Sequence, residues 1–169
     1  MTSPAFSVAW AARLRRPPTF KWVRIKPPGN MNSHKVIGTT SIQDRHRATC
    51  HCGSVVLELE LPDGVENPRR CNCSMCSRRG AVTASIPIER LHVIQGEEFL
   101  SRYQFNTLTA QHYFCRACGI YTHHQRRSDP SAYGYNVACL EGVDVFVLGP
   151  VPTSDGRHHI CDRGDQDAT

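Results

Sequence analysis

Seven of the nine cysteines stand in three tight clusters, and this spacing constrains the fold more than any other feature of the chain. Cysteines one or two residues apart are poorly placed to form a disulfide with each other, but such pairs readily bind two corners of a tetrahedral metal ion. The clusters therefore predict metal sites and a reducing compartment, with the cytoplasm as the expected location. The clusters are Cys50/Cys52, Cys71/Cys73/Cys76 and Cys115/Cys118.

The two outer clusters each end in a glycine, Gly53 and Gly119. Glycine adopts positive φ without a Cβ clash, which lets the following amides point at the sulfurs of a zinc knuckle. Two knuckles of two thiolates make one closed site, and a closed site has no position for substrate. Cys50, Cys52, Cys115 and Cys118 are therefore expected to bind a structural zinc.

The middle cluster offers three thiolates within six residues, Cys71, Cys73 and Cys76. Three protein ligands with a vacant fourth position are typical of a catalytic zinc, and three thiolates suit that ion to bind an incoming thiol. We therefore expect a second zinc with an open position. The alternative is a fourth ligand that closes the site, for which His123, His124 and Cys139 are candidates; adjacent strand residues face opposite sides, so at most one of the two histidines points at a site.

The rest of the chain from residue 49 onward predicts an all-β fold of several small antiparallel sheets. Residues 55–61 alternate leucine with glutamate, which indicates a half-buried strand. Short helical segments are expected after Ser74, ended by Gly80, and near 97–103. Further strands are expected, rich in β-branched and aromatic residues, at 81–86, 111–114, 120–123, 135–138 and 143–148.

Charge divides the chain into a basic leader (1–46), a zinc domain (47–160) and a polar tail (161–169). The first 47 residues hold nine Lys/Arg and one acid, whereas the remainder holds eleven Lys/Arg and fourteen Asp/Glu. The leader is expected to be disordered or a misassigned start, with an organelle-targeting peptide as the alternative. With two zinc ions bound the domain is net negative, so nucleic acid is not an expected partner. No apolar run is long enough to span a membrane.

With these motifs in hand, the chain resembles the family of glutathione-dependent formaldehyde-activating enzymes, which includes centromere protein V. The resemblance covers residues 49–158 and rests on five motifs in the same order and spacing. They are Cys50-His51-Cys52-Gly53-Ser54, Cys71-Asn72-Cys73-Ser74-Met75-Cys76 with Arg78 and Gly80, Phe114-Cys115-Arg116-Ala117-Cys118-Gly119, Asn136-Val137-Ala138-Cys139-Leu140-Glu141-Gly142, and Asp155-Gly156-Arg157.

The resemblance implies coiled antiparallel sheets like those of a zinc-binding exchange factor of Rab GTPases. It also implies the structural and catalytic zinc sites on the cysteines named above, and condensation of glutathione with formaldehyde by a carbon-sulfur lyase. Glutathione or another small thiol would be the partner, and Arg78 and Asn72 are candidates for binding it. The competing interpretation is a non-catalytic zinc module that binds a protein partner.

Overall fold

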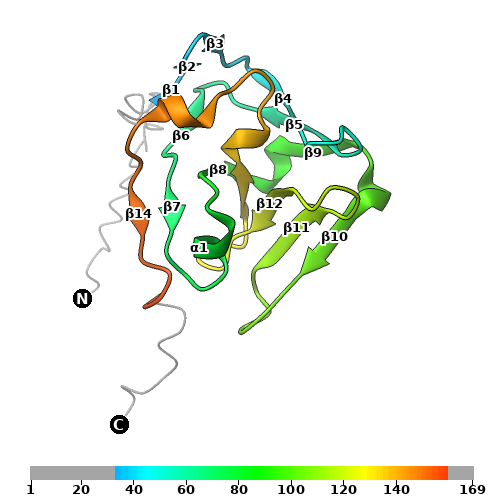
Figure 1. The fold of residues 1–169 in the computed structure, drawn as a ribbon, viewed down its shortest axis with the longest axis vertical. Coiled ribbons are helices and arrows are strands. Elements are labelled where there is room, and N and C mark those ends of the chain that lie inside the picture. Colours follow the sequence, from blue (N-terminus) through cyan, green and yellow to red (C-terminus); the bar gives the residue numbers. More distant parts are fainter. Residues whose placement is uncertain (1–32, 160–169) are drawn as a thin grey trace, which may run out of the picture.

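The computed structural model describes residues 33–159, and two antiparallel sheets hold most of its strand residues (Figure 1). The larger sheet has the strand order β10-β11-β12-β13-β8, and the smaller has β4-β5-β9. The mainly-β prediction is therefore confirmed. The strands are β4 (Arg45–Thr49), β5 (Val56–Glu60), β8 (Thr83–Pro87), β9 (Leu91–Gln95), β10 (Leu100–Tyr103), β11 (Gln111–Cys115), β12 (Tyr121–Gln125) and β13 (Ala132–Asn136).

Three two-stranded sheets and short helices complete the fold. β1 (Ser33–His34) pairs with β6 (Val65–Glu66), β2 (Val36–Ile37) with β3 (Thr40–Ser41), and β14 (Thr153–Ser154) with β7 (Arg70–Cys71). The last pair is parallel, so it brings the C-terminal segment beside the strand that carries Cys71 (Figure 1). The helical segments are α1 (Cys76–Arg79) and the 3-10 turns η1 (Ile88–Arg90), η2 (Glu97–Phe99), η3 (Val137–Cys139) and η4 (Val145–Leu148).

The core forms where the apolar face of β5 packs inward. Leu57, Leu59 and Leu61 are buried, while Glu58 and Glu60 remain partly exposed, as the alternation predicts. Burial of each such leucine contributes roughly 1.5–3 kcal/mol to folding. The buried cluster also includes Cys50 and Cys115, so the four-cysteine site is built into the core.

Three predicted elements differ from the structure. The predicted strand 135–138 overlaps only the end of β13, because the Asn136 side chain accepts a hydrogen bond from the Ala138 amide and starts η3. The predicted strand 143–148 is wrong: η4 forms there, because the Asp144 carboxylate accepts a hydrogen bond from the Phe146 amide at 2.9 Å and starts a helical turn. The predicted helix near 97–103 shortens to η2 and continues as β10. The helix after Ser74 is confirmed as α1 and ends at Gly80, whose φ is 66°.

The N-terminal boundary of the fold also differs from the expected residue 47. Strands β1 to β3 precede it, and Ile37 and Ile42 are buried in the core. Two apolar side chains in a segment of mixed polarity gave no periodic signal from which burial could be predicted. Residues 1–32 of the predicted leader and the predicted tail 161–169 lie outside the described residues. Within residues 33–159, no helix has the length and apolar character needed to cross a bilayer.

Candidate metal centres and the cavity beside them

The four-cysteine cluster has sulfur positions that fit a tetrahedral zinc site. The sulfur of Cys52 lies 3.5 Å from that of Cys50 and 3.8 Å from that of Cys115. Zinc–sulfur bonds of ~2.3 Å at tetrahedral angles place sulfurs about 3.8 Å apart. All four sulfurs, including that of Cys118, lie within 4.8 Å of one another. This cluster can therefore hold a metal ion with four protein ligands.

The local backbone explains why these sulfurs converge. Gly53 and Gly119 both have φ of 76°, the left-handed conformation expected of the two knuckles. The turns direct amides at sulfur, as in the 3.3 Å hydrogen bond from the Val55 amide to Cys50. Hydrogen bonds between Cys52 and Ser54 lower the pKa of the Cys52 thiol to about 6. Cys52 thus favours the thiolate, the form that binds metal, whereas burial raises the pKa of the Cys115 thiol to about 11.

The three-cysteine cluster is formed locally by β7 and the start of α1. The Cys73 amide donates to the Cys71 sulfur at 3.5 Å, and the Cys76 amide donates to the Cys73 sulfur at 3.4 Å. A hydrogen bond between Cys76 and Cys71 lowers the pKa of Cys71 to about 5 and raises that of Cys76. Such crowding favours one thiolate at the expense of its neighbour, and a divalent cation would stabilise all three.

None of the three candidates for a fourth ligand joins this cluster. Within residues 33–159, the group of ligand atoms lying within 4.8 Å of one another contains Cys71, Cys73 and Cys76 alone. The ring of His123 instead stacks on Tyr113, and the Cys139 thiol donates to the Tyr121 carbonyl at 3.6 Å. His124 lines the cavity described below. A four-coordinate metal ion held by these three sulfurs would have one position that no residue within 33–159 fills.

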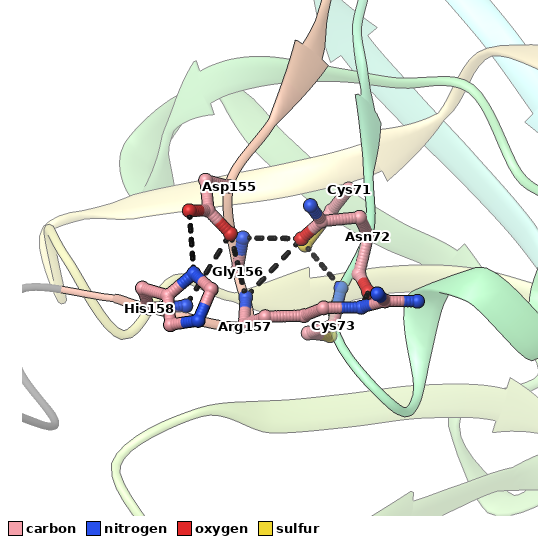
Figure 2. Close-up of polar contacts among 7 residues, drawn as sticks. All are labelled: Cys71, Asn72, Cys73, Asp155, Gly156, Arg157 and His158. Carbon is pink, nitrogen blue, oxygen red and sulfur yellow. Dashed lines mark hydrogen bonds and ion pairs between the residues drawn. The ribbon is translucent and has the colours of Figure 1, made fainter.

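A C-terminal loop, residues 155–158, lies beside Cys71 and Cys73 of the three-cysteine cluster (Figure 2). The side-chain oxygen of Asn72 accepts hydrogen bonds from the amides of Gly156, at 2.7 Å, and Arg157, at 3.1 Å. Position 156 requires glycine because the loop backbone lies close to the cluster, and a Cβ atom there would be 2.5 Å from the Cys71 sulfur. Asn72 therefore fixes the loop against the cluster, whereas the sequence analysis named it only as a candidate for binding substrate.

A cavity of about 420 Å³ opens beside the three cysteines. Its floor is a row of residues paired in register across the five-stranded sheet, and paired residues share a face. The row runs from Ser85 through Gly134 and His124 to His112. Gly134 is required here too, since a Cβ atom would lie 2.3 Å from the His124 ring. The prediction that at most one of His123 and His124 faces a site is confirmed.

The histidines on this floor are neutral and oriented. Burial lowers the pKa of His112 to about 4 and that of His124 to about 3. The Arg79 guanidinium lies 3.0 Å from Nδ1 of His112 and stacks 4.3 Å above the Tyr121 ring. Because arginine can only donate, Nδ1 of His112 is the acceptor and Nε2 carries the proton. His112 on the cavity floor therefore has a fixed tautomer.

The arginines of the cavity are not the one that the sequence singled out. The Arg78 guanidinium donates to the Ser74 carbonyl and does not line the cavity. Arg69, Arg126, Arg127 and Arg157 line it instead. Sequence reasoning missed these residues and His112, because they come from separate elements and no spacing rule links them. The one local signal was Arg157 in the Asp-Gly-Arg motif.

Comparisons with known proteins agree with this arrangement. The chain is similar to a Rhodobacter sphaeroides protein of known crystal structure, with 56% sequence identity and a TM-score of 0.62. The match covers 64% of this chain and 99% of that one. Residues 45–147 match the sequence model of the glutathione-dependent formaldehyde-activating enzymes, a span that includes both cysteine clusters. The chain belongs to the family of glutathione-dependent formaldehyde-activating enzymes.

Proposed function

We propose that the protein is a zinc-dependent carbon-sulfur lyase that forms and cleaves S-hydroxymethylglutathione. The observation that carries this proposal is the placement of a three-thiolate cluster, without a fourth protein ligand among residues 33–159, on the wall of a cavity of about 420 Å³. A structural site would need four ligands and would not border a cavity of this size. The family to which the chain belongs supplies the expected substrates, glutathione and formaldehyde.

The reaction joins the glutathione sulfur to the aldehyde carbon. The C=O π electron pair moves to the aldehyde oxygen, which takes up a proton, while the thiol loses one. A zinc ion held by the three sulfurs would supply a soft Lewis acid that lowers the pKa of the incoming thiol. His112, which carries its proton on Nε2 and lines the same cavity as the cysteines, would donate a hydrogen bond to the aldehyde oxygen. The reverse reaction uses the same groups.

Exchange spectroscopy by NMR tests the activity, because it measures interconversion of glutathione and its formaldehyde adduct at equilibrium. This matters because thiols add to formaldehyde without a catalyst. We expect the exchange rate to rise in proportion to the concentration of zinc-loaded protein. Cys73→Ser is expected to abolish the rise, whereas Cys139→Ser, which alters a buried cysteine outside both clusters, is expected to retain it.

Cobalt substitution tests whether a thiol enters the open position. Glutathione added to the cobalt-loaded protein is expected to increase the sulfur-to-cobalt charge-transfer absorption, and Cys73→Ser is expected to abolish that increase. An unchanged spectrum together with an uncatalysed exchange rate would contradict the lyase proposal. The protein would then be better described as a zinc module that binds a protein partner.

A further inference from the structure

Arginines outnumber acidic residues among the described residues that line the cavity. Four of the residues that line it are arginines, and Asp155 is the one carboxylate among them. The Asp155 carboxylate is already engaged by the amides of Arg157 and His158 and by the His158 ring, at 3.0–3.3 Å (Figure 2). Within residues 33–159, the lining therefore holds fewer acids than arginines.

The imbalance is sharpest at Arg69 and Arg126. The side chain of Arg126 is partly buried, and its pKa is lowered by burial and then by the nearby charge of Arg69. Asp129 opposes this effect but does not offset it. The Asp129 carboxylate accepts from the Ser131 amide and hydroxyl, and it does not line the cavity. The charge of Arg69 disfavours the charged form of Arg126, and an anion bound by both arginines would offset that repulsion.

The backbone fixes both arginines at the cavity. Arg69 and Thr83 exchange two backbone hydrogen bonds of 2.9 Å, which ties the segment before β7 to the edge strand β8. Arg126 follows β12, and its amide donates to the Ala132 carbonyl at 3.0 Å. Their side chains make weak neutral contacts, from Arg69 to the Asn67 carbonyl and from Arg126 to the Ser128 hydroxyl, at 3.2 and 3.3 Å. Anchored backbones of this kind lower the entropy lost on binding.

We propose that Arg69 and Arg126 form an anion subsite that binds a carboxylate of the thiol substrate. Guanidinium groups match carboxylates in a bidentate geometry, and two of them facing one cavity suit a single carboxylate. Thr83 and Ser85 on β8 and His124 on β12 line the same cavity as the cysteines and this pair. The thiol would therefore lie at the cysteine cluster while a carboxylate of the same molecule lies at the arginines. Only the identity of the thiol rests on the proposed function.

Binding of S-methylglutathione to the zinc-loaded protein tests the subsite apart from the thiol chemistry. This probe keeps both carboxylates of glutathione but has no free thiol. By isothermal titration calorimetry, Arg126→Gln and Arg69→Gln are each expected to weaken its binding by about 10- to 100-fold. The affinity of Arg126→Lys for S-methylglutathione is expected to lie between those of the wild type and Arg126→Gln. Arg90→Gln, at an exposed position outside the cavity, is the matched control and is expected to bind as the wild type does.

Thermal stability separates a binding role from a structural one. If Arg126 is held for an anion, Arg126→Gln in the absence of ligand is expected to unfold at the same temperature as the wild type or higher, because it removes like-charge repulsion. A structural arginine would give a lower unfolding temperature. Wild-type binding is also expected to weaken with added salt, and the diethyl ester of S-methylglutathione is expected to bind at least tenfold more weakly than the free acid.

The two proposals fail in different ways. Arginine-dependent binding of S-methylglutathione without catalysed exchange would contradict the lyase but leave the subsite. Catalysed exchange with the same KM for glutathione in wild type and in the Arg69→Gln/Arg126→Gln double variant would support the lyase and overturn the subsite. Equal binding of the acid and its ester, or no binding of either to the wild type, would also overturn the subsite.

Discussion

The two cysteine clusters differ in how the chain assembles them. The four-cysteine cluster joins two segments that are far apart in sequence: Cys115 follows Cys52 by 63 residues. Two of its cysteines are buried in the core. The three-cysteine cluster is contained within one segment, is partly exposed and borders a cavity. A metal that links distant segments stabilises the fold, whereas one held by a local loop leaves the fold largely independent of it. From this comparison we propose that the first cluster serves stability and the second chemistry.

The largest expected effect is on the four-cysteine cluster. Cys118→Ser removes one of its ligands, and because structural zinc sites contribute on the order of 10 kcal/mol to folding, the variant is expected not to fold cooperatively. Circular dichroism during thermal unfolding, with zinc content measured in parallel, checks this. A cooperative transition at the wild-type temperature would remove the distinction between the clusters.

The matching change in the three-cysteine cluster is expected to leave the fold intact. Cys73→Ser should reduce the zinc content from two ions to one and bring glutathione–formaldehyde exchange to the uncatalysed rate, while the unfolding temperature falls by only a few degrees. The readouts are metal analysis, calorimetry and exchange spectroscopy. If Cys73→Ser unfolded like Cys118→Ser, both clusters would be structural.

Gly156→Ala changes only the loop beside the three-cysteine cluster, so it tests that cluster without altering a cysteine. The added Cβ would lie 2.5 Å from the Cys71 sulfur and 2.8 Å from Cβ of Cys73, so the loop or the cysteines must move. Metal affinity at this cluster is expected to fall by about 10- to 100-fold, the usual cost of disturbing groups around metal ligands. A chelator competition experiment measures it.

Gly149→Ala is the control for this change. An added Cβ at Gly149 meets nothing within 4 Å, so any loss there comes from its φ of 68° alone. The control is expected to lower stability by about 1 kcal/mol without changing metal affinity. Equal metal affinity in Gly156→Ala and Gly149→Ala would show that the loop does not support the cluster.

The smallest expected effect is on the loss of folding stability in acid. Both the two metal sites and a buried histidine contribute to that loss. Burial lowers the pKa of His123 to about 4, so the folded state disfavours its protonation. Its contribution to stability is complete above the unfolded pKa of ~6.5 and is lost as the pH falls toward 4. His123→Phe keeps an aromatic ring between Tyr113 and Tyr133 but cannot titrate.

Urea unfolding at pH 7 and pH 5 measures this contribution. Between these values His123→Phe is expected to lose about 2 kcal/mol less stability than the wild type. The stability that His123→Phe still loses between pH 7 and pH 5 is then due to the thiolate sites and the other buried histidines. Equal losses in both proteins would assign the acid sensitivity to those groups alone.

Local features of the fold were predictable where they depend on neighbours in sequence. The alternation of 55–61 predicted β5, and Gly53, Gly80 and Gly119 predicted three positive-φ turns, because glycine tolerates that backbone conformation. The run 143–148 was not predictable in the same way. A short apolar segment without alternation fits a strand or a helical turn, and here the Asp144 cap decides.

The cysteine spacing by itself determined the two metal-ligand sets, since a tetrahedral ion and a knuckle of one or two residues leave few ways to combine seven sulfurs. Only the tertiary structure decided what surrounds the three-cysteine set. Strand register placed His112 beside His124 and His124 beside Gly134, and the parallel pairing of β14 with β7 brought Gly156 against Cys71. Spacing along the chain fixes groups a few residues apart, whereas the cavity depends on pairings between distant strands, which no local pattern encodes.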